Sequence, residues 1–239
     1  IDRQLLEKKK LLEKSIMMEQ FFVYEIIKQP LRVHLEKEGY LSISFLARGS
    51  HGYIFTAMKD GKKVSLKVKN PSSKSEHVAA KEAEKLAYVN TLGVGPELVE
   101  YDDEHGYLVY EYVDGVPWSK YYETAAMAQI RSIVLDLLKQ CHQMDKAGFQ
   151  KQEMKRPNKN VIITQGEPVL IDFERGVFKK RCSNVTQFLQ YLLDSKFSVH
   201  MKTAYGVTFE RDYITALSRT YLQNGDILPI KEYVTELLL

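Results

Sequence analysis

A glycine-bearing turn in the first quarter of the chain could hold a phosphate group. Residues 47–54 read Ala-Arg-Gly-Ser-His-Gly-Tyr-Ile and lie where two β-rich runs meet. Glycine lets the backbone come close to a ligand, so exposed N–H groups can meet phosphate oxygens. A dinucleotide-binding fingerprint requires a helix directly after its glycines, and here a strand follows instead. An ordinary flexible hairpin tip is the alternative interpretation.

Lys67 is a second candidate for contact with a phosphorylated ligand. It lies in the run 64–68, Val-Ser-Leu-Lys-Val, whose alternate residues point to opposite faces of a strand. A lysine on a phosphate-facing surface supplies a point charge but needs an acid to hold it. Glu82, on the same helical stripe as Leu86, offers that acid. The alternative is a solvated edge-strand lysine and a surface glutamate.

Asp172 is the third candidate, because it directly follows the apolar run Val169-Leu170-Ile171. An acid at the end of a buried strand costs free energy unless it has a partner. The loop before this strand carries the basic residues Lys151, Lys155, Arg156 and Lys159. Such a cluster favours an anionic ligand, with a solvated loop as the alternative.

The N-terminal half of the sequence is β-rich and has to position the first two candidates. Asp60-Gly61 separates two β-rich runs and suits the positive φ angles of a type I′ turn. A helix is predicted over about 76–92, and paired apolar residues over about 5–27 predict an amphipathic helix that ends before Pro30. The strands are expected over residues 41–46, 53–59, 63–68, 97–101 and 107–112.

Beyond Gly115 the composition becomes helical. An apolar stripe from Ile130 to Cys141 predicts a core helix. Residues 161–164 and 169–173 predict a short strand pair joined by residues 165–168, and further helices are expected from about Val185. We therefore expect a helical extension over 1–38, a β-rich lobe over 39–114 and a helical lobe over 115–239.

Composition argues against a disordered chain, a nucleic-acid-binding protein, a disulfide-rich domain and a membrane-spanning protein. The chain has 239 residues with 44% hydrophobic residues, enough for a substantial core. Its formal net charge of +3 is too small to indicate a nucleic-acid or anionic membrane partner. Its two cysteines form no CxxC pair, and no apolar run approaches the ~20 residues that a membrane helix requires. We expect a cytoplasmic location, with no nucleic-acid partner and no membrane span.

The motifs over about residues 41–191 resemble those of the protein kinase superfamily. Val64-Ser65-Leu66-Lys67 is similar to the VAIK strand, and residues 47–54 are similar to the GxGxxGxV loop with alanine in place of the first glycine. This resemblance implies ATP as ligand and an ion pair of Lys67 with Glu82. The loop residues that it places on ATP are Ala47, Gly49, Ser50, Gly52 and Ile54.

The segment 107–115, Tyr-Leu-Val-Tyr-Glu-Tyr-Val-Asp-Gly, is similar to the family's strand-to-hinge segment. The resemblance makes Tyr110 the gatekeeper. It also implies that the Glu111 carbonyl and the Val113 amide pair with the adenine edge, which backbone groups can do whatever side chains they carry.

Ile171-Asp172-Phe173-Glu174 resembles the metal-binding DFG segment in the form found in small atypical kinases, the RIO kinases and the KEOPS-associated kinase. The resemblance makes Asp172 a ligand of Mg²⁺, a hard cation that prefers carboxylate and phosphate oxygens. Residues 153–157 also resemble a loop of predicted archaeal serine/threonine kinases.

The catalytic loop departs from the family pattern. Residues 148–154 align with the segment that normally ends in His-x-Asp-Leu, so Lys151 replaces the histidine and Glu153 replaces the catalytic aspartate. A glutamate can accept or orient a hydroxyl proton, but its extra methylene moves the carboxylate by more than ~1 Å. Glu153 is therefore the candidate base.

Two asparagines compete for the second metal-ligand position that the resemblance implies. Asn158 has the family spacing from Glu153, whereas Asn160 directly precedes the apolar strand 161–163, as the family asparagine does. We favour Asn160, with an expansion of the loop around Pro157, and keep Asn158 as the alternative.

Together the motifs predict an α+β, two-lobed protein kinase-like fold with a five-stranded antiparallel N-lobe, a reduced helical C-lobe and an N-terminal helical extension. ATP would lie between the lobes with Mg²⁺. The implied activity is ATP-dependent phosphotransfer, most simply by an atypical serine/threonine protein kinase, onto an unidentified protein or small-molecule acceptor. The alternatives are a pseudokinase or nucleotide-binding regulatory module, and a small-molecule kinase.

Overall fold

A computed structural model describes residues 17, 27, 29–48, 52–70 and 77–239, which fold as two units. The first unit contains the described residues up to Glu84 together with Glu97–Tyr112. The second contains Lys85–Pro96 and Val113–Leu239. The lobe boundary expected near Gly115 stays a prediction.

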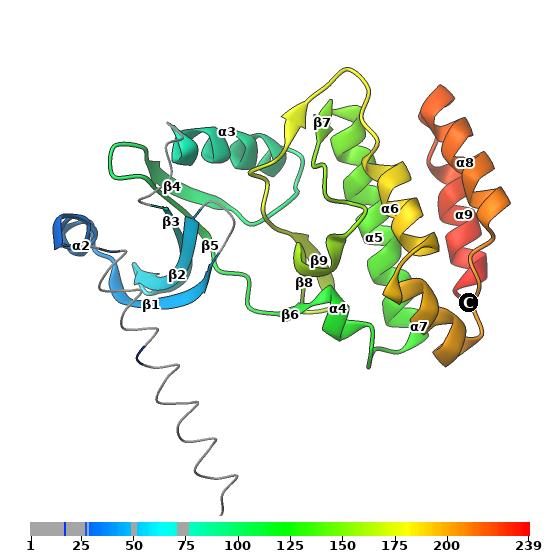
Figure 1. Ribbon diagram of the computed structural model, residues 1–239, viewed down its shortest axis with the longest axis horizontal. Coiled ribbons are helices and arrows are strands. Elements are labelled where there is room, and N and C mark those ends of the chain that lie inside the picture. Colours follow the sequence, from blue (N-terminus) through cyan, green and yellow to red (C-terminus); the bar gives the residue numbers. More distant parts are fainter. Residues whose placement is uncertain (1–16, 18–26, 28, 49–51, 71–76) are drawn as a thin grey trace, which may run out of the picture. The chain divides into compact units, whose positions relative to one another are not determined.

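The first unit is built on one five-stranded antiparallel sheet with the order β1-β2-β3-β5-β4 (Figure 1). The helices of the second unit follow this sheet in the chain. This arrangement confirms the predicted α+β fold class. The strands are β1 (Leu41–Arg48), β2 (Gly52–Lys59), β3 (Lys62–Lys69), β4 (Leu98–Asp102) and β5 (Tyr107–Glu111).

The turn between β2 and β3 has the conformation that the sequence predicts. Asp60 has φ +49° and Gly61 has φ +74°, and Lys59 pairs directly with Lys62. Positive φ at both central residues defines a type I′ turn, whose twist matches that of the strands. The turn therefore fixes the register of β2 against β3.

One face of this sheet packs on α2 (Gln29–Lys37), a helix that the sequence interpretation missed. Leu35 of α2 and Tyr40 are fully buried against Phe55 and Leu66 of the sheet. Pro30 lies in the first turn of α2, where a missing N–H costs no hydrogen bond. The amphipathic helix expected over 5–27 lies outside the described residues, apart from Met17 and Ile27.

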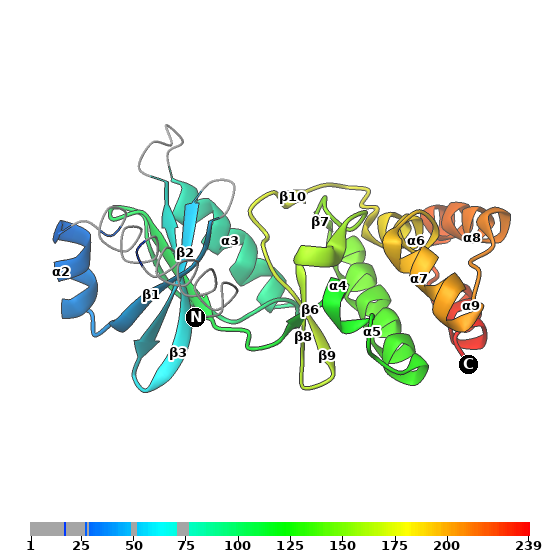
Figure 2. The same ribbon diagram turned by 60° about the horizontal axis from the view of Figure 1, so that its bottom comes forward.

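The other face of the sheet carries α3 (Val78–Asn90), predicted over 76–92 (Figure 2). Residue 76, where we expected the helix to begin, lies outside the described residues. The helix ends at Asn90, Gly93 follows with φ +68°, and the Asn90 side-chain amide donates hydrogen bonds to the carbonyls of Val94 and Pro96, at 3.1 and 2.9 Å. Those bonds turn the chain back toward β4.

The second unit is mainly helical, as expected, and has two small sheets. One is β6-β8-β9 and the other pairs β7 with β10. Its elements are β6 (Val116–Pro117), α4 (Trp118–Tyr121), α5 (Met127–Lys146), β7 (Phe149–Gln150), the 3₁₀ helix η1 (Pro157–Lys159), β8 (Val161–Thr164), β9 (Glu167–Leu170), β10 (Val177–Phe178), α6 (Asn184–Leu193), α7 (Lys196–Tyr205), α8 (Arg211–Asn224) and α9 (Leu228–Leu237).

The strand expected over 169–173 is displaced toward the N-terminus. A two-residue turn, with Gln165 at φ +51° and Gly166 at φ +84°, replaces the expected four-residue link, so β9 begins at Glu167. The strand ends at Leu170, and Asp172, two residues later, has φ +62°, which is far from the extended conformation of a regular strand. Asp172 therefore lies beyond the strand end, just before the turn at Glu174 and Arg175.

Helix α5 forms the centre of the second unit. It packs against α6 and α9, and α6 packs against α7 and α8 (Figure 1). The apolar stripe predicted along this helix is fully buried. Within the described part of the chain, none of the helices combines the length and hydropathy that a membrane crossing requires.

Candidate functional site

The strand register aligns three of the predicted nucleotide-binding residues in one row. Ala47 of β1 lies opposite Ile54 of β2, and Ile54 lies opposite Lys67 of β3. Directly opposed residues of an antiparallel sheet share a face. Ala47, Ile54 and Lys67 therefore lie side by side on the face that carries α3, opposite to the core beneath α2.

Lys67 forms a buried ion pair with Glu82 of α3. The Nζ atom lies 2.8 Å from Oε1 and 2.7 Å from Oε2, and the two side chains are only 10% and 7% exposed. All residues from Val64 to Val68 are buried, so β3 is a central strand covered on both faces. The edge-strand alternative for Lys67 therefore fails, and the predicted pairing with Glu82 is present in the structure.

Gly52 is required by the sheet itself. A Cβ atom at this position would lie 2.5 Å from the Val68 carbonyl oxygen, because β2 and β3 come very close where β2 begins. Any side chain would force these strands apart. Gly49 and Ser50, which complete the predicted loop, lie outside the described residues.

The predicted gatekeeper, Tyr110, lies next to the end of β5. It is opposite Ser65 of β3 and therefore shares the face of Lys67, two residues further along the strand. Glu111 ends β5, and its N–H donates to the Glu97 carbonyl at 2.9 Å. Val113 is the first residue of the chain's return to the second unit.

In the second unit, the segment around Asp172 is anchored by Lys151. The Lys151 Nζ atom donates to the carbonyl oxygens of Ile171 and Asp172, at 2.7 and 2.6 Å, and lies 4.7 Å from the ring centre of Phe173. Only 1% of Lys151 is exposed. The sequence interpretation counted Lys151 in a basic cluster for an anionic ligand. This was wrong for Lys151, because its charge is directed into the unit.

Replacing Lys151 with methionine is expected to lower the free energy of unfolding of the second unit by about 2–4 kcal/mol, since two charged hydrogen bonds are lost and two carbonyls lose a donor. The protein's one tryptophan, Trp118, is buried in this unit, so its fluorescence during urea unfolding measures the effect. The exposed Lys155 provides the control, and Lys155→Met should change stability by less than about 0.5 kcal/mol. Equal stability of the two variants would contradict the anchoring role.

A buried polar network holds the other side of the same loop. The Asn184 Oδ1 atom accepts from the Gln150 side-chain amide and from the Lys151 N–H, both at 2.9 Å. The Asn184 amide in turn donates to Asp145 Oδ1 at 2.8 Å. Burial raises the pKa of Asp145, while hydrogen bonds from Val185, Asn184 and the Tyr221 hydroxyl oppose that shift. Sequence reasoning missed this network, because its members are far apart along the chain.

Glu153, the candidate base, is held by two neighbours. Asn160 donates its side-chain amide to Glu153 Oε2, and Arg175 Nη1 lies 3.3 Å from Oε1. Arg175 was not among the predicted site residues, although it follows Asp172 by only three positions. The carboxylate is thus oriented by one neutral and one cationic donor.

The two candidate asparagines have different surroundings. The Asn158 Oδ1 atom accepts from the Tyr191 hydroxyl at 2.7 Å, so this side chain is part of the packing against α6. Asn160 contacts Glu153, and its backbone carbonyl accepts from the Ile171 N–H at 2.9 Å. These contacts link Asn160, and not Asn158, to the segment that contains Asp172.

Each unit thus contains one group of predicted site residues. In the first unit, a single sheet face carries Ala47, Ile54, Lys67 and Tyr110, and Glu82 reaches it from α3. In the second, hydrogen bonds connect Glu153 to Asn160 and connect Asn160 to the residue before Asp172. Phosphoryl transfer generally uses a cation near the phosphates and oxygen ligands for a metal ion, and these two groups contain side chains of those types.

A five-stranded antiparallel sheet with a helix between its third and fourth strands, followed by a helical part, defines a protein kinase-like fold. No protein-family model matches the sequence, and neither does any curated protein. Among solved structures, the Rio2 kinase-ADP/Mg²⁺-phosphoaspartate complex from Chaetomium thermophilum is similar, with a TM-score of 0.56 and 15% identity over 80% of this chain. A further Rio2 kinase structure from that organism has a TM-score of 0.49 and 14% identity over 80% of this chain.

The chain therefore has a RIO-like protein kinase fold, as the motifs predicted. It spans 64% of the length of the Rio2 chain in the first of these structures and 66% in the second.

Proposed function

We propose that this protein is an ATP- and Mg²⁺-dependent phosphotransferase that acts as an atypical serine/threonine protein kinase. The observation that carries the proposal is the buried Lys67–Glu82 ion pair, in one row with Ala47 and Ile54, within a RIO-like kinase fold. A buried lysine held by a glutamate in a fixed orientation can contact the phosphates of a nucleotide without losing its charge. Ala47 and Ile54 are apolar neighbours on the same face and suit the adenine ring.

The second unit supplies oxygen ligands that fit Mg²⁺. Mg²⁺ prefers carboxylate, amide and phosphate oxygens in octahedral geometry. Asp172 offers a carboxylate. Because the amide nitrogen of Asn160 faces Glu153, its Oδ1 atom is the one that can ligate a metal ion. When bound, the ion would neutralise charge on the phosphates, and Asn158 is the less suitable ligand because Tyr191 engages its oxygen.

Glu153 is the proposed base or orienting group for the phosphoacceptor hydroxyl. Its two carboxylate oxygens are held by Asn160 and Arg175, which limits the freedom that the extra methylene would otherwise add. A carboxylate in this position can accept or orient the proton of a serine or threonine hydroxyl. The adenine edge would be recognised by the Glu111 carbonyl and the Val113 amide.

The departures from the family pattern favour a second candidate function, that of a nucleotide-binding pseudokinase. Glu153 stands where the family has aspartate. The replacement of histidine by Lys151 is weaker evidence for a pseudokinase, because Lys151 anchors the backbone at Ile171 and Asp172 through two hydrogen bonds. A small-molecule kinase remains the third alternative, distinguished by its acceptor.

Incubation of the purified protein with Mg²⁺ and ATP labelled in the γ-phosphate tests these proposals. We expect ATP turnover, with label transferred to serine or threonine of the chain itself or of an added protein acceptor. Binding of ATP without turnover would overturn the enzyme proposal and support the pseudokinase. Label found only on a small molecule would contradict a protein kinase.

The chemistry of any label on the chain should also be determined. The Rio2 complex contains phosphoaspartate. An acyl phosphate is released by hydroxylamine, whereas phosphoserine and phosphothreonine are stable to it. We expect the label transferred to an acceptor to resist hydroxylamine, and complete release would contradict serine/threonine transfer.

A further inference from the structure

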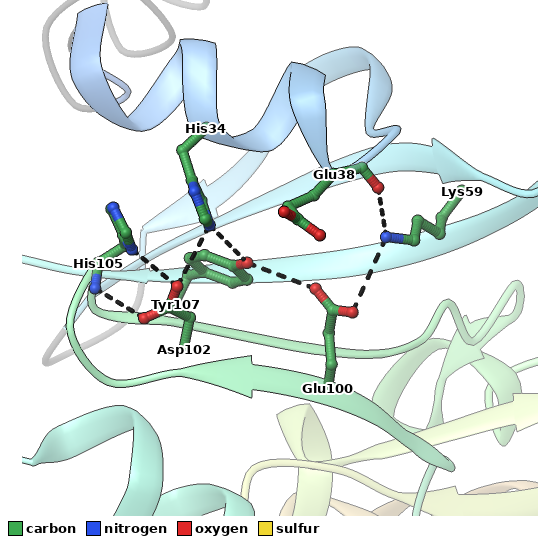
Figure 3. Close-up of polar contacts among 7 residues, drawn as sticks. All are labelled: His34, Glu38, Lys59, Glu100, Asp102, His105 and Tyr107. Carbon is green, nitrogen blue, oxygen red and sulfur yellow. Dashed lines mark hydrogen bonds and ion pairs between the residues drawn. The ribbon is translucent and has the colours of Figure 1, made fainter.

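Two histidines and an aspartate gather on the α2 side of the sheet (Figure 3). His34 comes from α2, Asp102 ends β4, and His105 lies in the turn between β4 and β5. The Asp102 Oδ2 atom lies 3.2 Å from His34 Nε2 and 2.7 Å from His105 Nδ1. All three belong to the first unit, and their ligand atoms lie within 4.8 Å of one another.

The Asp102 carboxylate lies at the centre of this cluster. Its Oδ1 atom accepts a hydrogen bond from the backbone N–H of His105 at 2.9 Å, and its Oδ2 atom faces the rings of both histidines. The three side chains are 23–33% exposed, so an ion from solvent can reach them. The cluster therefore combines a carboxylate and two imidazoles with access to water.

The donor atoms favour a transition-metal ion over Mg²⁺ or Ca²⁺. Two imidazole nitrogens and one carboxylate oxygen suit zinc, which is usually four-coordinate and takes nitrogen and oxygen ligands at about 2.0–2.2 Å. Mg²⁺ and Ca²⁺ prefer oxygen ligands throughout. We propose that His34, Asp102 and His105 form a zinc-binding site with a water molecule as fourth ligand.

Zinc would replace the protons that now join the cluster. Zinc binds a neutral imidazole through the lone pair of its unprotonated nitrogen, so each ring would coordinate as the tautomer that carries its single proton on the other nitrogen. The two rings are stacked, with centroids 3.8 Å apart and planes at 9°, so one ring must rotate for both lone pairs to meet one ion. His105 can do so, because it lies in a surface turn and is 33% exposed.

Tyr107 and Glu100 surround the site without acting as ligands. The Tyr107 hydroxyl lies 3.3 Å from His34 Nε2 and 3.4 Å from Glu100 Oε1 (Figure 3). Burial raises the pKa of Tyr107, and the charges of Glu100 and Asp102 raise it further, so the hydroxyl stays protonated. Lys59 lies 3.8 Å from Glu100 Oε2 and balances that carboxylate. These contacts orient the His34 ring.

Bound zinc would connect α2 to the β4–β5 hairpin. His34 and His105 are far apart in sequence, and any ion that binds only the folded arrangement stabilises it. The site does not rest on the proposed phosphotransfer, because none of its ligands has a role in that function.

Titration of the metal-free purified protein with ZnCl₂ tests the proposal, by calorimetry and by the change in Tm. We expect one zinc per chain and a rise in Tm. His105→Ala should weaken zinc binding by more than ~10-fold, since loss of even an outer-shell contact costs 10–100-fold. His77→Ala is the matched control, because His77 also pairs with an aspartate, Asp103, but is 67% exposed and outside the cluster.

Replacement of zinc by Co²⁺ gives an independent readout, because a tetrahedral site with nitrogen and oxygen ligands gives visible d–d absorption. We expect these bands in the parent protein and in His77→Ala, and their loss in His105→Ala and Asp102→Asn. Zinc binding that is equally tight in His105→Ala and the parent, or no stoichiometric binding by the parent, would overturn the proposal.

Discussion

Replacing Asp172 with asparagine is expected to reduce ATP turnover by about 10³-fold and to leave the fold unchanged. The substitution removes a preorganised negative charge from the proposed phosphoryl-transfer site. Electrostatic stabilisation of the transition state is usually the largest contribution to the rate of such a reaction. Asparagine has nearly the same shape and, like aspartate, tolerates the φ of +62° at this position. The two hydrogen bonds from Lys151 go to backbone carbonyls, so the substitution leaves them in place.

The comparison requires a control for the backbone conformation. Asp60 also has a positive φ, in the type I′ turn between β2 and β3, and is not a site residue. Asp60→Asn is expected to retain full turnover. Turnover by Asp172→Asn above about one tenth of the parent rate, with an unchanged Tm, would contradict the role of Asp172. Alanine is a poorer substitution, because it adds strain of about 1 kcal/mol at positive φ.

Replacing Lys67 with methionine is expected to lower the free energy of unfolding by about 3–5 kcal/mol and to abolish turnover. Methionine fills much of the same volume but leaves the Glu82 carboxylate, only 7% exposed, without its cation. Removing one partner of a buried ion pair destabilises a protein by more than the intact pair stabilises it. Because Trp118 lies in the second unit, far-UV circular dichroism and hydrogen exchange of the β3 amides are the suitable measurements.

The double variant Lys67→Met/Glu82→Leu separates stability from function. Both charges are removed together, so we expect it to be more stable than Lys67→Met, as well-packed apolar residues often replace a buried ion pair without loss. It should still lack turnover, because the Lys67 cation proposed to contact the phosphates is gone. Turnover by the stable double variant would show that Lys67 has a structural role only.

Local patterns in the sequence predicted much of the fold. The Asp60-Gly61 turn, the apolar stripe of α5 and the alternation in β3 depend on residues a few positions apart, so one sequence contains what decides them. The displaced β9 and the missed helix α2 are two exceptions. In both cases a turn or helix-end signal was assigned to the wrong residues. Gln165-Gly166 form the whole turn before β9, and Pro30 begins helix α2 instead of following the end of a helix.

The candidate site residues were predictable where they lie on a regular strand or helix, and ambiguous where they lie in a loop. Lys67 and Glu82 lie on a strand and a helix of regular period, so their meeting could be expected. Asn158 lies in a 3₁₀ turn and Asn160 directly follows it. Neither residue belongs to a repeating pattern from which the direction of its side chain could be predicted. In the folded chain, Asn158 accepts a hydrogen bond from Tyr191, a residue of another helix, and Asn160 contacts Glu153.

By itself, then, the sequence determined the order of the elements, the α+β class and the residue types that suit nucleotide chemistry, because periodicity, turn chemistry and residue type are local properties. Only the tertiary structure decided that Lys151 is directed inward to the carbonyl of Asp172, and that His34 lies beside Asp102 and His105. These arrangements join residues far apart along the chain. Their contacts exist only after helix and sheet have packed, since burial selects which polar groups must find each other.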